Sequence, residues 1–369
     1  MKIAIVTSIK APYRTLQLES ICKASDVLMT VYYTQEGKED RLWETRDGKL
    51  FNEIYLKKIK SFNKYGNLNC GLFNIVKGND VIVLGGYEKP TYILLALLCK
   101  FFKKKYILIF DGISVNKLDT KESILKKYIK NFVIKNSKFI WGNGTVSERY
   151  FCEKFNYPKN KIYNQYLTVD SKAIKEIGKN KRLVRKELRG KYNIEDNMKI
   201  LHYSGRLVEL KNIKRVIMAL SKIKDKSLIL LITGGGEQEA YLKKIANELD
   251  VNIIITGFID NQYELFKHYF MSDVFILPSV DEAWGLVVNE AMFSGLPVLV
   301  SNICGCSLDL VKGNGYLINP FDIEDIKMKI EKIFFESDLN LMGKYSEKII
   351  EEYNFKNSAL SFINMIKEL

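Results

Sequence analysis

Short apolar runs alternate with longer amphipathic segments along almost the whole chain. Runs rich in β-branched and aromatic residues predict strands at Lys2–Val6, Val27–Tyr33, Asp80–Leu84, Tyr106–Phe110 and Lys138–Trp141, then at Lys199–Tyr203, Ser227–Thr233, Val251–Thr256, Val274–Leu277 and Val298–Val300. Segments of helical length, such as Tyr92–Phe102 and Lys121–Lys135, lie between several of these runs. Such alternation predicts an α/β fold, in which parallel sheets are connected by crossover helices.

The length of 369 residues is sufficient for two domains. The stretch Asp170–Asp196 is polar and rich in Lys, Arg and Glu, and it predicts a linker that merges into a surface helix. We therefore expect one α/β domain over residues 1–170 and a second one over residues 171–354. Tandem domains of this kind bind ligands in a cleft between the carboxyl edges of their sheets. Apolar residues of Phe355–Leu369 recur at helical spacing and predict a final helix.

Composition excludes several classes of protein and site. The longest apolar run, Tyr92–Phe102, contains Lys100 and is shorter than the ~20 residues that span a bilayer. The first residues contain no extended apolar region, so we expect no secretory signal and a cytoplasmic location. The six cysteines include no Cys-x-x-Cys pair and only two histidines are present, so we expect neither a metal nor another cofactor. Cys304 and Cys306, the one close pair, are interpreted as small core residues.

The positive charge is confined to one half of the sequence. The chain carries +14 overall, with +15 in residues 1–180 and −1 in residues 181–369. This asymmetry suggests an anionic partner for the first half, such as a membrane surface, an acceptor or a nucleic acid. Lysines that only keep the protein soluble explain it equally well. The densest clusters are Lys100 with Lys103–Lys105, and Lys57, Lys58, Lys60 and Lys64.

Two common phosphate-binding motifs are absent. The first glycine is Gly37, so the turn after Lys2–Val6 cannot form a dinucleotide fingerprint. None of the five Gly-Lys pairs is followed by Ser or Thr, which excludes a P-loop. The turn Thr233–Glu237 contains three consecutive glycines, Gly234–Gly236, and permits close approach of a ligand, although tight loops contain such glycines as well.

The segment from Pro278 to Val298 contains the most informative pattern. A helix is predicted from about Gly285 to Gly295, with Glu282 just before its start and Glu290 on the helix two turns after Glu282. The amides of Gly285, Leu286 and Val287 lie between the two carboxylates, where the N-terminus of a helix favours an anion. A diphosphate bound there would have a carboxylate near the group at each end, as a nucleotide sugar requires. A capped amphipathic helix with incidental glutamates is the alternative.

These residues resemble family 4 of the retaining nucleotide-sugar glycosyltransferases, which have the GT-B fold. The family pattern P-S-x-x-E-G-F-G-L-x-x-x-E-A-M-x-x-G-x-P-V is matched from Pro278 to Val298, except at Ala283 and Trp284. Further blocks match Gly205–Asn212, Thr233–Glu237 and Gly257 through Tyr269. The first half resembles the family only in the spacing of its predicted strands along the sequence and in loops such as Ala11–Arg14.

The resemblance implies a fold and a set of roles. It implies two Rossmann-like domains facing across a cleft, with the C-terminal helix crossing back to the first domain, which carries the acceptor. Arg206 and Lys211 would hold the donor diphosphate, Glu290 the ribose, and Glu282 the transferred sugar. Further donor contacts would come from the helix-start amides of Gly285, Leu286 and Val287, and, around the base, from Gly235, Phe258 and Ile259. No metal is then required, and a glycan or lipid-linked molecule accepts the sugar with retention of configuration.

The sequence departs from the family at one position of the first half. Members commonly have a His-Asp or related pair after the strand that matches Tyr106–Phe110, whereas this chain has Asp111-Gly112. Asp111 either binds a hydroxyl of the donor or acceptor, as a catalytic residue, or caps the following loop.

Three functions remain open at this level. The leading one is a glycosyltransferase of cell-surface polysaccharide synthesis, peripheral on the inner face of the cell membrane. A nucleotide-sugar epimerase of the same fold is the second. A non-enzymatic basic protein that binds membrane or nucleic acid is the third, although the first half has no aromatic signature of RNA binding and we expect no nucleic acid.

Overall fold

The computed structural model describes residues 1–36, 46–62, 66–120 and 122–369. Lys64, from one predicted lysine cluster, and Lys121, the first residue of one predicted helix, lie outside the described residues. The chain divides into two compact units. Unit 1 comprises residues 1–113, 117–167 and 353–369, and unit 2 comprises residues 114–116 and 168–352.

Unit 1 is built on a seven-stranded sheet in the order β3-β2-β1-β6-β7-β8-β9, in which every neighbouring pair is parallel. The strands are β1 (Lys2–Thr7), β2 (Leu28–Tyr33), β3 (Asn52–Tyr55), β6 (Val81–Leu84), β7 (Lys105–Ile109), β8 (Phe139–Gly142) and β9 (Ile162–Asn164). A small antiparallel pair joins β4 (Lys58–Ser61) and β5 (Asn67–Asn69). The central strands are buried on both faces, which explains why they are continuous apolar runs in the sequence.

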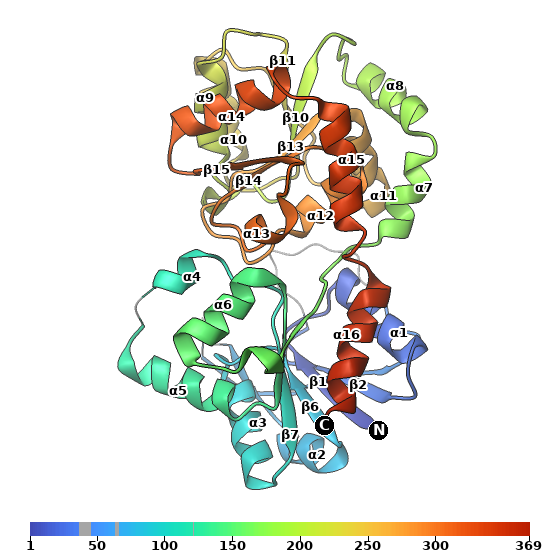
Figure 1. Ribbon diagram of the computed structural model, residues 1–369, viewed down its shortest axis with the longest axis vertical. Coiled ribbons are helices and arrows are strands. Elements are labelled where there is room, and N and C mark those ends of the chain that lie inside the picture. Colours follow the sequence, from blue (N-terminus) through green and yellow to red (C-terminus); the bar gives the residue numbers. More distant parts are fainter. Residues whose placement is uncertain (37–45, 63–65, 121) are drawn as a thin grey trace. The chain divides into compact units, whose positions relative to one another are not determined.

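Helices cover both faces of this sheet (Figure 1). They are α1 (Pro12–Lys23), α2 (Leu72–Gly78), α3 (Pro90–Phe101), α5 (Ile124–Lys135), α6 (Gly144–Phe155) and α16 (Phe355–Lys367). The short helix α4 (Asn116–Asp119), which has no buried residue, and a 3-10 turn at Lys159–Lys161 lie in the connections. The last helix, α16, packs beside α1 on one face, where Phe362 contacts the indole of Trp141 with ring centroids 4.9 Å apart. The C-terminal helix therefore returns to the first domain, as expected.

Unit 2 contains a six-stranded parallel sheet in the order β12-β11-β10-β13-β14-β15. Its strands are β10 (Lys199–Ser204), β11 (Leu228–Thr233), β12 (Ile253–Ile255), β13 (Val274–Leu277), β14 (Val298–Ser301) and β15 (Gly315–Ile318). Its helices are α7 (Ser171–Gly178), α8 (Lys181–Lys191), α9 (Ile213–Ser221), α10 (Glu239–Glu248), α11 (Gln262–Met271), α12 (Leu286–Phe293), α13 (Ser307–Leu310), α14 (Ile323–Phe335) and α15 (Leu339–Ile350), with a 3-10 turn η3 at Glu209–Lys211. The expected α/β class with parallel sheets in two domains is confirmed.

Of the linker merging into a surface helix that was predicted over Asp170–Asp196, the helix is confirmed and the linker is wrong. This stretch forms α7 and α8, which pack against α11. The apolar side chains of both helices, Ile174, Ile177, Val184 and Leu188, are buried. Their spacing of three or four residues provides each helix with one apolar face. Most charged residues lie on the solvent side, but Arg185 of α8 donates to the carbonyl of Met271 at 2.9 Å.

The described residues include no helix that is long and apolar enough to cross a membrane.

Candidate functional site

The loop after β10 and the glycine-rich loop after β11 lie backbone to backbone in unit 2. The amide of Leu207 donates to the carbonyl of Gly235 at 2.9 Å, and that of Gly234 donates to the carbonyl of Gly257 at 3.0 Å. A Cβ at Gly234 would lie 2.0 Å from the carbonyl oxygen of Gly205. Packing between the loops therefore requires Gly234, independently of any ligand. A Cβ at Gly235 would instead meet its nearest neighbour at 3.6 Å, so this glycine is not required in the same way.

Lys211 and Glu282 form an ion pair between the loops that follow β10 and β13. Only 19% of each side chain is exposed, so both charges are largely removed from water. The next residue, Asn212, has a left-handed backbone with φ of 61° and fastens the two loops together. Its side-chain amide donates to the carbonyls of Pro278 at 3.1 Å and of Pro320 at 2.7 Å. The sequence alone did not predict that Lys211 would lie against Glu282.

The helix α12 begins at Leu286 and has Gly285 as its N-cap. Gly285 has φ of 92°, and a Cβ there would lie 2.6 Å from a methyl group of Leu277, so both conformation and space require glycine. The same position lies 3.5 Å from Cγ of Glu282, which places that side chain directly beside the start of the helix. A glycine N-cap has no side-chain oxygen to offer, and the first amides of a helix have no intrahelical partner. The amides of Leu286 and Val287 therefore present the positive end of α12 next to the Lys211–Glu282 pair.

Glu290 lies on α12 with its side chain buried. Its Oε2 accepts a hydrogen bond of 2.5 Å from the hydroxyl of Tyr269 on α11. Burial raises the pKa of the Glu290 carboxyl to about 7, and the bond from Tyr269 only partly opposes this rise. Tyr269 is a site residue for which the sequence assigned no role, although it ends one of the family blocks.

Two loops at the carboxyl ends of strands carry the remaining donor candidates. Arg206 is exposed in the loop after β10, and its own carbonyl accepts a hydrogen bond of 3.0 Å from the hydroxyl of Tyr203. In the loop after β12, Phe258 is exposed and Ile259 is partly buried. The nearest atom to a Cβ at Gly235 is the amide nitrogen of Phe258, so the glycine-rich loop and this aromatic residue are neighbours. Trp284, which departs from the family pattern, is buried and donates from its indole to Asn289 at 3.0 Å.

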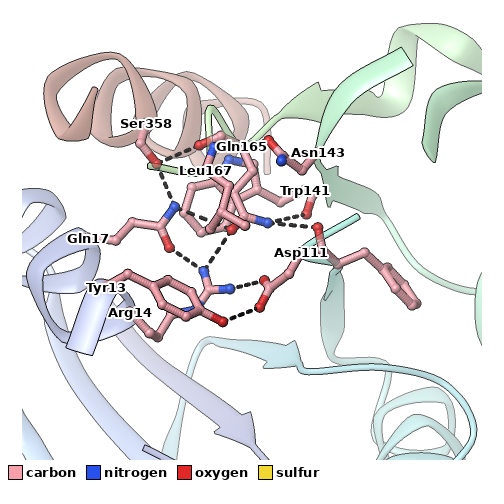
Figure 2. A network of polar contacts seen from close by, with 10 residues as sticks. Tyr13, Arg14, Gln17, Asp111, Trp141, Asn143, Gln165, Leu167 and Ser358 are labelled. Atoms are coloured by element: carbon pink, nitrogen blue, oxygen red, sulfur yellow. Dashed lines mark hydrogen bonds and ion pairs between the residues drawn. The ribbon is translucent and has the colours of Figure 1, made fainter. Parts of the chain in front are cut away.

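Asp111 follows β7 in unit 1, where two residues from the start of α1 hold its carboxylate (Figure 2). Tyr13 donates its hydroxyl to Oδ2 at 2.7 Å, and the guanidinium of Arg14 forms an ion pair with Oδ1. The Asp111 side chain remains 41% exposed, whereas that of Arg14 is 8% exposed. Asp111 is thus a rigidly held carboxylate that solvent still reaches.

A buried network continues from Arg14 to the C-terminal helix (Figure 2). Arg14 donates to the side-chain oxygens of Gln17 and, at 2.9 Å, of Gln165. Gln17 donates to the hydroxyl of Ser358 on α16 at 2.7 Å, and that hydroxyl donates to the carbonyl of Gln165 at 2.6 Å. The position of Asp111 therefore depends on α1, on the segment after β9 and on α16 together.

Within residues 1–36, 46–62, 66–120 and 122–369, no cluster of three or more His, Cys, Asp or Glu side chains could hold a metal ion. Cys304 and Cys306 are buried free thiols, and burial raises the pKa of both.

Known proteins resemble this chain in sequence over part of its length and in fold over all of it. Residues 184–352 match the family model of "Glycosyl transferases group 1". An uncharacterized glycosyltransferase of Methanocaldococcus jannaschii is 28% identical over 224 residues, which are 58% of this chain and 56% of the relative. The chain thus spans about half the length of this archaeal relative. The O-antigen biosynthesis glycosyltransferase WbnH of Escherichia coli is 26% identical over 313 residues, covering 83% of this chain and 80% of WbnH.

Solved structures extend the likeness in fold to both units. HepE of Anabaena, in complex with UDP, superposes with a TM-score of 0.77 and 15% identity over 100% of both chains. WaaG, a glycosyltransferase involved in lipopolysaccharide biosynthesis, does so with a TM-score of 0.68 and 18% identity over 99% of both chains. The matched residues contain Arg206, Lys211, Glu282 and Glu290, the sheet of unit 2 and the loops at its carboxyl edge. Residues 184–352 are accordingly a glycosyl transferases group 1 domain on a chain with the GT-B fold.

Proposed function

We propose that the protein is a retaining glycosyltransferase of family 4 that transfers a sugar from a nucleoside-diphosphate donor to a glycan or lipid-linked acceptor. The observation that carries the proposal is the Lys211–Glu282 pair beside the glycine-capped start of α12. A cation and helix amides suit a diphosphate, and the adjacent carboxylate suits the hydroxyls of a sugar attached to it.

The diphosphate is the leaving group of the proposed reaction. Its bond to the anomeric carbon breaks, and negative charge grows on the departing phosphate oxygen. Lys211, Arg206 and the amides of Gly285, Leu286 and Val287 stabilise that charge, which is the main electrostatic task in such a transfer. Glu282 accepts hydrogen bonds from the transferred sugar. Lys211, which pairs with Glu282 and binds the diphosphate, therefore lies between the two parts of the donor.

The nucleoside end of the donor lies against α12 and the loop after β12 in this proposal. Glu290 accepts hydrogen bonds from the ribose hydroxyls, with Tyr269 holding the carboxylate in place. The exposed ring of Phe258 and the neighbouring Gly235 and Ile259 flank the base. The UDP bound by HepE, a protein of the same fold, supports a nucleotide in this role.

The acceptor contributes the oxygen that forms the new bond to the anomeric carbon, and its hydroxyl proton passes to the departing diphosphate or to water. We assign Asp111 as the carboxylate of unit 1 that accepts a hydrogen bond from a hydroxyl of the acceptor or donor sugar. Tyr13 and Arg14 occupy part of its hydrogen-bonding capacity and fix its orientation, while the exposed part is free to take that hydroxyl. No nucleophile is assigned, and the proposed reaction requires no metal and no cofactor.

Cell-surface polysaccharide synthesis is the proposed setting. The O-antigen role in the name of WbnH supports a glycan or lipid-linked acceptor. Because such acceptors are assembled on membrane carriers, we place the enzyme in the cytoplasm, peripheral on the inner face of the cell membrane.

A scan of nucleotide sugars tests the proposal. A donor that binds only the folded protein raises its thermal stability, and the stabilising donor is then incubated with and without candidate acceptors. Release of free nucleoside diphosphate together with a glycosylated acceptor supports the proposal. Conversion of one nucleotide sugar into another without release of nucleotide would identify an epimerase, and no effect of any nucleotide sugar would favour a non-enzymatic basic protein.

A further inference from the structure

A groove of about 790 Å³ lies on unit 2, outside the proposed donor contacts. Its walls are η3, the first half of α9, the start of α10 and the loops after β13 and β15. Pockets of about 300–1,000 Å³ are typical of ligand sites. The candidate donor residues are not among the described residues that line this groove. We define the α9–α10 groove by Glu209, Lys214, Arg215, Gln238, Tyr241 and Phe321.

The path of the chain places the α9–α10 groove on the face of the sheet that α12 does not cover. From β10 the chain crosses through α9 to β11, whereas from β13 it crosses through α12 to β14, in the opposite direction along the sheet. Because crossovers between parallel strands are right-handed, the two helices lie on opposite faces. Helices α9, α10 and α14 accordingly pack together, and α11 packs with α12 (Figure 1). A ligand in the groove is therefore separate from a donor at the start of α12.

Two aromatic rings line the groove, and each has a cation beside it. Tyr241 of α10 is 41% exposed, and Nζ of Lys214 lies 5.5 Å from the centre of its ring. Phe321, after β15, is 58% exposed, and Cζ of Arg215 lies 5.7 Å from the centre of that ring. Both cations belong to the first turn of α9. The groove thus contains the same arrangement twice, an exposed ring with a positive charge next to it.

Acidic side chains of the protein do not neutralise these two cations. Within the described residues neither Lys214 nor Arg215 forms an ion pair. Arg215 is held in place by a hydrogen bond of 2.8 Å that it donates to the side-chain oxygen of Asn212. Glu209 is the one acid among the described residues that line the groove, and it is exposed. The lining therefore carries a net positive charge.

Acids next to the groove are engaged elsewhere. Glu239 of α10 pairs with Lys243 at 2.7 Å, and Glu324 of α14 pairs with Lys222. Asp322, which follows Phe321, caps α14 by accepting hydrogen bonds from two backbone amides of that helix. The cations of the groove are consequently available to an anionic ligand.

The repeated arrangement of ring and cation indicates the class of that ligand. In an acidic polysaccharide each sugar acid has a ring whose C–H bonds form an apolar face, and a carboxylate attached to that ring. The apolar face packs on an exposed aromatic ring, and the carboxylate pairs with the cation beside it. A nucleotide has one base and would use only one of the two rings. An acidic peptide has carboxylates but no ring on the acidic residues.

We propose that the α9–α10 groove binds an acidic glycan, with one sugar ring on Tyr241, another on Phe321, and their carboxylates at Lys214 and Arg215. The proposal goes beyond the transfer reaction, because none of the proposed donor and acceptor contacts uses these residues. A glycan held in the groove stays with the enzyme between transfers, which raises its effective concentration. That benefit rests on the proposed function, whereas the binding itself does not.

Titration calorimetry on the whole chain tests the groove. The acidic probes are trigalacturonate and a hyaluronan tetrasaccharide. Maltotriose provides sugar rings without charge, and polyglutamate provides charge without sugar rings. The ring variant is Tyr241→Ser/Phe321→Ser. Its matched control is Phe335→Ser on α14, because Phe335 is 44% exposed and has Lys199 over its ring at 4.1 Å, but lies outside the groove.

The parent should bind the acidic probes at least about tenfold more tightly than maltotriose or polyglutamate. The ring variant should lose about tenfold or more in affinity for them, and Phe335→Ser should bind like the parent.

The charges of the groove should act in opposite directions. Lys214→Gln should lose about two- to fivefold in affinity at about 0.1 M salt and less at about 1 M, with Lys186→Gln on α8 as control. Glu209→Gln should instead bind the acidic probes about twofold more tightly, since it removes the acid of the lining. A role of these residues in folding alone predicts no such gain.

Several results would overturn the proposal. They are failure of both acidic probes to bind the parent, unchanged affinity in the ring variant, and an equal loss in Phe335→Ser. Equal binding of maltotriose would show that charge is not recognised, and equal or tighter binding of polyglutamate would identify an acidic peptide as the ligand instead. Glu290→Gln should keep the affinity for trigalacturonate, and the ring variant should keep that for a nucleoside diphosphate. Failure of this proposal and failure of the transfer reaction are therefore distinguishable.

Discussion

Lys211 and Glu282 neutralise each other across two loops of unit 2, with four-fifths of each side chain withdrawn from solvent. Such a pair is costly to break by removing one partner, because the remaining charge stays buried without compensation. A diphosphate that enters beside Lys211 provides that cation with a second anionic partner. The pair therefore leaves neither charge uncompensated before the donor binds, whereas the two negative charges of a bound diphosphate also require Arg206 and the amides at the start of α12.

Replacing the cations should weaken binding of a nucleoside diphosphate. For Lys211→Ala we expect a loss of about 2–5 kcal/mol, since the interaction is largely desolvated. Arg206 is more exposed, so Arg206→Ala should cost less. Titration calorimetry measures both, with Lys226→Ala as the control because Lys226 pairs with Asp250 on the exposed surface. Parental affinity in both variants would rule out the diphosphate assignment.

The two glutamates should differ in what they affect. Glu290→Gln should weaken binding of the free nucleotide, because the ribose hydroxyls lose a charged acceptor. Glu282→Gln should lower turnover much more than nucleotide affinity, since its proposed contact is with the sugar. Nucleotide affinity and kcat, measured separately for each variant, test this. If the two variants weaken nucleotide binding to the same extent, the glutamates do not act at opposite ends of the donor.

Glu290 should make stability depend on pH. Its pKa is raised to about 7 in the folded protein, so between its unfolded value and about 7 the folded state binds the extra proton. The free energy of unfolding therefore falls as pH rises through this range, by an amount on the order of 3 kcal/mol for this group. Denaturant unfolding from pH 4.5 to 8 should show this decline in the parent and a smaller one in Glu290→Gln. Identical pH profiles would show that Glu290 is not buried as described.

Tyr269 provides a companion test of that titration. Its hydrogen bond lowers the pKa of Glu290, so Tyr269→Phe should raise that pKa further and move the decline in stability to higher pH. The comparison with Glu290→Gln separates the lost hydroxyl from the lost carboxylate. A shift to lower pH would contradict the assigned hydrogen bond.

Asp111→Asn should lower turnover and leave nucleotide affinity unchanged, because the proposed nucleotide contacts all lie in unit 2. Arg14 keeps Gln17 and Gln165 as partners in this variant, so unit 1 should still fold. Steady-state kinetics and nucleotide titration measure the two properties, with the exposed Asp119→Asn as control. Full activity in Asp111→Asn would leave this carboxylate a purely structural anchor for Tyr13 and Arg14.

Replacing each of two glycines by alanine should change the stability of the protein in opposite directions. Gly234→Ala would place a methyl group 2.0 Å from a backbone oxygen at φ of 142°, and we expect it to destabilise unit 2 by about 1–3 kcal/mol or more. Gly190 lies within α8 with nothing near its Cβ position, so Gly190→Ala should stabilise the protein by about 0.5–1 kcal/mol. Thermal unfolding of both variants decides, and equal Tm values would contradict the packing of the glycine-rich loop.

The sequence predicted those features that depend on local periodicity. Buried parallel strands such as β13 are continuous apolar runs, and their limits could be predicted to within one or two residues. Polar composition favoured a linker where α7 and α8 lie. Apolar residues at helical spacing, such as Ile174 and Ile177, were the better indication of a packed helix. The antiparallel pair of β4 and β5 was not predicted, because its strands are short and mostly exposed.

The contacts within the site could not be predicted in the same way. Lys211 and Glu282 are 71 positions apart, and Arg14 and Asp111 are 97 apart, so no local pattern relates them. They meet because parallel strands bring their carboxyl ends, and the loops that follow, to one edge of each sheet. Motif spacing identified the candidate residues of unit 2, while only the fold shows which of them neutralise each other.

The return of α16 to unit 1 has a consequence for the order of folding during synthesis. Unit 2 consists almost entirely of residues 168–352 and can complete its core once these have left the ribosome. Unit 1 must wait, because Phe362, Met365 and Ile366 of α16 cover a face that includes Trp141 and Leu18. The core of unit 1 is therefore completed last, and until then the apolar face that α16 covers is exposed to water.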